Sequence, residues 1–156
     1  MIKINLITIG DIKEDYLRQA IQEYSKRISR FAELRIVELK ENNPQSNNSK
    51  DIETALEKDA QNIEKHLKGY AICLDINSNQ LSSEQFAEKI KNLALKTSEI
   101  SFIIGASNGI AERIKQRCNE KLSFSKMTFP HQLMRVIFLE QLYRAFTINN
   151  NIAYHK

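Results

Sequence analysis

The spacing of apolar residues changes repeatedly along this chain, and each change predicts a switch between strand and helix. Densely apolar runs predict strands at residues 2–9, 34–40, 70–76 and 99–106. The last two runs are apolar at almost every position, which is typical of strands buried on both faces.

Between the strands, apolar residues recur every three or four positions, as on one face of a helix. This spacing predicts helices over residues 17–31 and 52–67, the second ending at Gly69, a residue type that suits a helix C-terminus. The polar run ENNPQSNNSK before the second helix predicts a surface loop. Ser82 and Gln85 have the spacing of a capping box and predict the start of a third helix.

The chain then continues with a short predicted helix at about residues 110–118 and ends with an unusual one. Apolar residues of the last helix, from Leu133 to Phe146, cover far more than one face. A helix that is apolar nearly all round must be buried nearly all round, in the centre of the domain or against another subunit. Because this surface looks too large for a small monomer to cover, we expect a homodimer with an apolar interface around this helix.

Alternating strands and helices predict an α/β fold, a mainly parallel sheet with helices on both faces. The 156 residues suit one domain, residues 1–156, which is large enough to form a stable core without disulfides or metal ions. Neither an internal repeat nor a second domain is visible in the sequence.

Charge is distributed unevenly along the chain. Residues 1–106 have 15 Lys and Arg against 16 Asp and Glu, or −1, whereas residues 107–156 have 8 against 3, or +5. A basic final third is expected where that part meets a polyanion, although a solvated basic surface explains it equally well.

Several classes of protein find no support in the sequence. Cys73 and Cys118 fit no metal or redox spacing, and two lone thiols suggest a reducing compartment. The three histidines are scattered, so we expect no metal site. No run has the length of a membrane span, and the N-terminal run is too short and too alternating for a signal peptide. We therefore expect a cytoplasmic protein without a membrane partner.

In parallel sheets, ligands bind beyond the carboxyl ends of the strands, so the strand-to-helix turns are the places to look. The turn after Leu74 is explained by a turn and a helix cap alone. The turn with Gly105 and Gly109 allows close approach of a ligand, but it lacks the dinucleotide and phosphate-loop spacings, and glycines often serve only the turn.

The stretch SFSKMTFPHQLMR, residues 123–135, is the third candidate. Pro130 suits the first turn of the last helix and leaves the amides near Thr128 and Phe129 available to a polar ligand edge. The simpler interpretation is a plain helix start, with Ser125 or Thr128 capping and His131 bonded locally.

Four segments then carry a resemblance: FIIGASNG, LSFSKMTFPHQLMR, EQLYRAF and the terminal AYHK, in this order. With them the chain resembles, over its whole length, the ribosomal RNA large subunit methyltransferase H family of SPOUT-class knotted methyltransferases. The family commonly has two glycines where this chain has Gly105 and Ala106.

The resemblance implies a homodimer of α/β domains, each with a C-terminal trefoil knot that binds S-adenosylmethionine. It places cofactor contacts at Leu74, Gly105, Phe124, Ser125, Lys126, Met127, Thr128 and Phe129. The implied reaction is methylation of N(3) of a pseudouridine in large-subunit (23S) ribosomal RNA, on the assembled ribosome. We expect the ammonium of Lys126 to point away from the cationic sulfonium.

Residue type and position suggest roles for the remaining candidates. His155 suits a general base, because its unperturbed pKa of about 6.5 leaves it mostly neutral at physiological pH. Tyr154 either orients the RNA nucleobase, as a second catalytic residue, or anchors the tail in the core. Contacts to the RNA are expected from Arg135, Arg144, Lys156 and His131.

Two rival functions remain open at this point. One is a non-catalytic module that binds RNA or the ribosome, which the basic final third supports. The other is an enzyme that acts on a different nucleotide-like substrate, for which the Gly105 turn is the only support.

Overall fold

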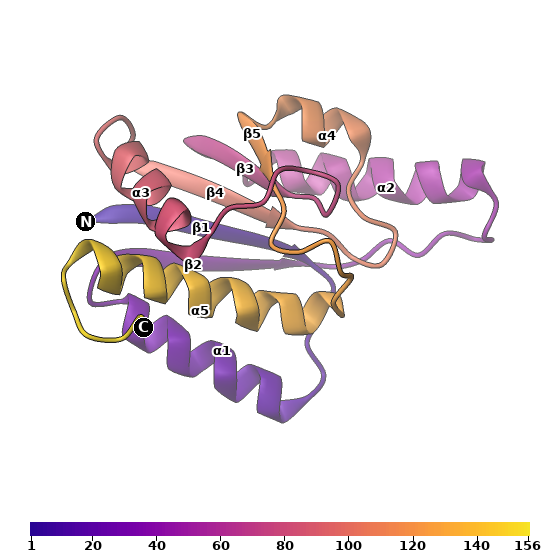
Figure 1. The fold of residues 1–156 in the computed structure, drawn as a ribbon. Helices are drawn as coiled ribbons and strands as arrows, with labels where there is room; N and C mark the ends of the chain where they lie inside the picture. Colours follow the sequence, from indigo (N-terminus) through magenta and orange to yellow (C-terminus); the bar gives the residue numbers. More distant parts are fainter.

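The computed structural model, which describes all 156 residues, contains one five-stranded sheet and five helices (Figure 1). In chain order the elements are β1 Ile2–Ile9, α1 Asp15–Ile28, β2 Ala32–Leu39, α2 Ser49–Glu64, β3 Tyr70–Leu74, α3 Ser83–Ala94, β4 Glu99–Ile104, α4 Glu112–Arg117, β5 Glu120–Leu122 and α5 His131–Asn149. The strand order is β2-β1-β4-β3-β5, and every pair is parallel. The predicted α/β class is confirmed, with a sheet that is wholly rather than mainly parallel.

The sheet order brings distant turns together. β4 lies between β1 and β3, so the turns that follow Ile9, Ile104 and Leu74 leave the same edge of the sheet next to one another. Because these are carboxyl ends of neighbouring parallel strands, this edge is where a ligand is expected.

Helices cover both faces of the sheet, and side chains alternate between the two cores. In β1, Ile4 and Leu6 face the larger core, which α1, α3 and α5 cover, whereas Ile7 and Ile9 face the smaller core under α2 and α4. α5 lies between α1 and α3 and packs against both (Figure 1).

This position explains the unusual composition of α5. Phe138, Leu139 and Leu142 are fully buried within the subunit, and Phe146 is 6% exposed. Leu133, at the beginning of the helix, is the one large apolar residue of α5 that remains exposed. Of the two predicted alternatives, the helix is central to the domain, because the sheet and two flanking helices cover most of it; the homodimer stays a prediction.

Two predicted helix ends are also corrected. α2 ends at Glu64, five residues before Gly69. Gly69 is required for a different reason: its φ is +67°, and a Cβ there would lie 2.0 Å from the carbonyl oxygen of Glu99. α1 ends at Ile28, and Phe31 stacks on Phe146 from the turn that follows, with ring centroids 5.7 Å apart.

The remaining predicted features differ in their outcome. The capping box at Ser82 and Gln85 is confirmed, with both hydrogen bonds present. The three-residue strand β5 is not predicted, because it is too short to show a period. None of the five helices is long and apolar enough to cross a membrane. The trefoil knot implied by the resemblance stays a prediction.

Candidate active site

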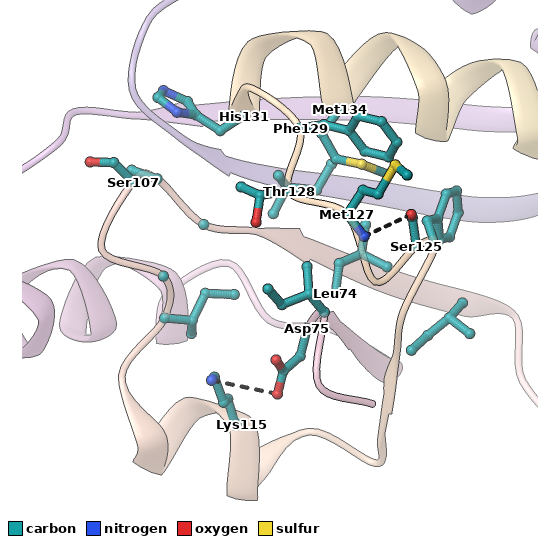
Figure 2. A pocket seen from close by; sticks show the side chains of 18 residues that line it. Leu74, Asp75, Ser107, Lys115, Ser125, Met127, Thr128, Phe129, His131 and Met134 are labelled. Atoms are coloured by element: carbon teal, nitrogen blue, oxygen red, sulfur yellow. Dashed lines mark hydrogen bonds and ion pairs between the residues drawn. The ribbon is translucent and has the colours of Figure 1, made fainter. Parts of the chain in front are cut away.

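A cavity of about 220 Å³ lies at the carboxyl edge of the sheet, between the turns after β3 and β4 and the loop before α5 (Figure 2). Its lining includes seven of the eight residues expected at the cofactor: Leu74, Gly105, Phe124, Ser125, Met127, Thr128 and Phe129. Lys126, the eighth, is exposed and does not line the cavity. Residues from three separate segments thus meet at one place.

In the loop of residues 123–130, the hydroxyl groups of two serines form hydrogen bonds with the loop backbone. The backbone N–H of Ser123 donates to the carbonyl of Asn79, and its hydroxyl donates to the carbonyl of Ser125. The Ser125 hydroxyl in turn accepts the N–H of Met127, at 2.9 Å. No side chain caps α5, so Ser125 caps a turn within the loop and not the helix.

This arrangement leaves polar groups of the loop unused. The backbone N–H groups of Thr128 and Phe129 donate to no acceptor in the protein. The side chain of Phe124 packs edge-on against Phe86 and holds the loop to the core. The cavity therefore combines apolar walls with free main-chain donors, which is typical of a site for a planar heterocycle.

Gly105 is needed by its own loop, whatever the cavity binds. A Cβ at Gly105 would lie 2.6 Å from the carbonyl oxygen of Gly109 and from a side-chain carbon of Ile110. Gly109 has a φ of +80° and donates its N–H to the carbonyl of Ala106. A larger residue at Gly105 would distort this turn, so such a substitution does not isolate a ligand contact.

Arg135 and His131 lie beside the carboxyl end of β1. Arg135 is 1% exposed, and its Nη2 donates to the carbonyls of Ile9 and Gly10 at 2.8 and 2.9 Å. Burial lowers the pKa of Arg135. A buried guanidinium is out of reach of an RNA phosphate, so the structure gives Arg135 a role in fixing the end of β1 and not the surface contact we expected.

His131 is half-buried and lines the cavity. Burial lowers its pKa, and the positive charge of Arg135 lowers it further. The imidazole is therefore neutral at physiological pH and presents no charge to RNA there.

The C-terminal tail folds back along the outer side of α5 (Figure 1). The Tyr154 hydroxyl donates to Oε1 of Glu140 at 3.0 Å, its ring meets Tyr143 edge-on, and the Arg144 guanidinium lies 4.7 Å from its centroid. Burial and the Glu140 hydrogen bond raise the pKa of Tyr154 to about 12. In this conformation Tyr154 is an anchor and keeps its proton.

Both ring nitrogens of His155 are occupied in the same cluster. Nδ1 lies 3.1 Å from Nη1 of Arg144, and Nε2 lies 2.7 Å from Oε1 of Glu84. Because a guanidinium only donates, Nδ1 must accept, and the single proton of the neutral ring is on Nε2 and is donated to Glu84. His155 has no free lone pair in this state, and neither it nor Tyr154 lines the cavity.

Comparisons with known proteins agree with this geometry. The family model described as "Predicted SPOUT methyltransferase" matches residues 2–155. The chain is 48% identical over 155 residues to the ribosomal RNA large subunit methyltransferase H of Caldicellulosiruptor saccharolyticus, with 98% of this chain and 99% of that protein covered. It is 50% identical over 157 residues to the protein of the same name from Clostridium novyi, with the same coverage.

The chain belongs to the ribosomal RNA large subunit methyltransferase H family. A solved structure, that of a probable methylase family protein from Haemophilus influenzae, shares the fold at a TM-score of 0.52 and 16% identity. It matches 95% of this chain, which spans 66% of that one.

The structure identifies further side chains that the sequence does not predict as part of a site. Glu140 is the only acidic residue of α5, and it holds both Arg144 and Tyr154. Its i,i+4 spacing to Arg144 was the available signal. Asp75 and Lys115 also line the cavity, whereas the sequence around Asp75 predicts only a turn and a helix cap.

Proposed function

We propose that this protein transfers a methyl group from S-adenosylmethionine to N(3) of a pseudouridine in large-subunit ribosomal RNA, on the assembled ribosome in the cytoplasm. The observation that carries the proposal is the single cavity that gathers residues 74, 105, 124, 125 and 127–129 at the carboxyl edge of a parallel sheet.

The cavity residues fit the cofactor by their chemistry. Leu74, Ile104 and Phe129 offer apolar surface to the faces of an adenine ring, and the free amides of Thr128 and Phe129 suit the acceptors on its edge. Lys126 contributes backbone to this loop, while its exposed ammonium stays away from a sulfonium. When bound, S-adenosylmethionine supplies an electrophilic methyl group, so the protein must align the acceptor nitrogen and remove its proton.

We assign the removal of the proton on N(3) to His155. Its Nδ1 accepts this proton after Arg144 has released that nitrogen. Before that release Arg144 and Tyr154 hold the tail against α5, and Lys156 meets RNA phosphates. Because the tail does not line the cavity of its own subunit, it has to move or serve another subunit before it can act there.

A homodimer is part of the proposal. Ile76, Met127 and Leu133 expose 47%, 74% and 39% of their surface at the mouth of the cavity and the beginning of α5. Two large exposed apolar residues that line the cavity, with a third at the beginning of α5, favour an interface there. Sedimentation at micromolar concentration should give about twice the 18.1 kDa chain mass, and a clean monomer would refute the dimer.

The decisive test uses ribosomes from cells that lack this protein. Incubated with the purified protein and methyl-labelled S-adenosylmethionine, they should gain one methyl group on 23S RNA, located by mass spectrometry of nuclease fragments. Ribosomes from cells that retain the protein are the matched control and should accept almost none, because their target is already modified.

The rival function, a module that binds RNA without chemistry, predicts a different result. Such a module would bind ribosomes but give no heat with S-adenosylmethionine in calorimetry and would transfer no label. The basic final third supports this rival, but it leaves the cavity unexplained.

A further inference from the structure

Asp75 is the one acidic side chain that lines the cavity, and Lys115 is the one lysine or arginine there. Asp75 follows directly after β3, and Lys115 reaches towards it from α4 (Figure 2). Lys115 Nζ lies 3.5 Å from Oδ2 of Asp75, and the two side chains are 21% and 12% exposed. An ion pair this far withdrawn from water is costly to form unless both charges are well satisfied.

The pair is not fully satisfied within the protein. Asp75 is fixed by its N–H, which donates to the carbonyl of Leu122, and by Oδ1, which accepts the N–H of Asn77. Oδ2 accepts no hydrogen bond, and Nζ of Lys115 donates none. Their separation of 3.5 Å exceeds the ~2.7–2.9 Å of a charge-assisted hydrogen bond. Both atoms therefore keep hydrogen-bonding capacity beside the cavity.

An α-amino acid group complements such a pair. It carries an ammonium and a carboxylate on one carbon, so a single group can place a positive charge beside a fixed carboxylate and a negative charge beside a fixed ammonium. Of the groups in the proposed cofactor, only the methionine end has this chemistry.

We propose that Asp75 and Lys115 bind the zwitterionic α-amino acid end of the cofactor, Asp75 accepting from its ammonium and Lys115 donating to its carboxylate. The inference rests on the proposed function, because it assigns one end of the same cavity. It makes the pair a specificity determinant: adenosine derivatives without the amino acid group leave both charges unsatisfied.

Calorimetry with three ligands tests the assignment. S-adenosylmethionine and S-adenosylhomocysteine contain the amino acid end, whereas 5′-methylthioadenosine keeps the adenosine and a thioether but lacks that end. Asp75→Asn and Lys115→Gln should each weaken binding of the first two about 10- to 100-fold, as for a lost hydrogen bond to a charged group. Their affinity for methylthioadenosine should change less than about twofold.

The variants are chosen to preserve the fold. Asn at position 75 still offers Oδ1 to the N–H of Asn77, and Lys115→Gln tests the pair independently if the first variant melts early. Lys121→Gln, an exposed lysine of β5 outside the cavity, is the control and should bind all three ligands like the wild type.

Two results would overturn the inference while the proposed function stands: unchanged affinity for S-adenosylmethionine in both variants, or an equal loss for methylthioadenosine, which would indicate a purely structural pair. A wild-type protein that binds none of the three ligands would instead refute the proposed function, and this inference with it.

Discussion

The two ends of α5 differ in how their polar groups are used. At its beginning, the cavity leaves the amides of Thr128 and Phe129 without acceptors. At its end, each polar side-chain atom of Tyr154, Arg144 and His155 has a partner within the same subunit. A site with free donors is ready to receive a ligand, whereas a cluster that satisfies itself must lose contacts before it can act. We therefore expect cofactor binding to depend on the first region and methyl transfer on the second.

Removing the tail should separate the regions most clearly. Deletion of residues 154–156 should leave affinity for S-adenosylmethionine within about twofold, because none of the three lines the cavity. Methyl transfer should fall by more than about 10³-fold, since the proposed base and its positioning groups are lost together. Single-turnover rates on unmethylated ribosomes and calorimetry on the same preparation measure the two effects. Full activity in the truncated protein would exclude His155, Tyr154 and Lys156 from the mechanism.

A single substitution sharpens the assignment within the tail. His155→Ala should lower the single-turnover rate by about 10² to 10⁴, the usual contribution of a general base, with little change in ribosome affinity. His66→Ala is a matched control, because this half-buried histidine lies outside the cavity and the tail cluster. If the rate for His155→Ala stays within a few-fold of wild type, the base is another group.

The last residue should contribute to binding and not to the chemical step. Lys156 is exposed and makes no ion pair. Lys156→Ala should weaken ribosome binding a few-fold and reduce the slope of log affinity against log salt by up to about 0.9, as for one lost phosphate contact. Lys96→Ala, an exposed lysine in the loop before β4, gives the background value. An unaltered salt dependence would show that Lys156 meets no phosphate.

The smallest expected effect is a pH dependence of the free energy of unfolding that comes from His131, which lines the cavity. The pKa of His131 is lower in the folded protein than in the unfolded chain, so the unfolded chain binds the proton more readily. Stability from this group is complete above the unfolded pKa of about 6.5 and declines as pH falls towards the folded pKa. Thermal unfolding followed from about pH 7.5 to pH 5 should show this decline, and His131→Gln should reduce it. If the wild type and His131→Gln lose thermal stability equally between about pH 7.5 and pH 5, His131 is not the group responsible.

Sequence and structure agree best where a local pattern determines the outcome. The four long strands, the capping box at Ser82 and the loop that ends at Pro130 all follow from residues close together in the chain. The strand order could not be read from these patterns, because it depends on which buried strands meet. The meeting of Leu74, Gly105 and Phe124 was implied by family resemblance and not by spacing.

Single long-range partners could not be predicted from the sequence. Arg135 was expected to contact RNA because nothing near it in the sequence identifies its partners. They are two carbonyls at the end of β1, more than a hundred residues earlier, which accept hydrogen bonds from its guanidinium. The contact of His155 with Glu84 could not be read from the sequence either, because Glu84 belongs to another helix; the general-base role of His155 stays a prediction. Charges on an apolar helix can be recognised in a sequence, but the groups that neutralise them cannot.

The central position of α5 has a consequence for biosynthesis. The helix is made after all five strands, yet Phe138, Leu139 and Leu142 fill the core between α1 and α3. Until it is made, the growing chain exposes the apolar face that α5 later covers, and exposed surface of this kind invites aggregation. We therefore expect folding to be completed only after α5 has emerged from the ribosome that synthesises the chain, and truncations before Pro130 to depend on chaperones.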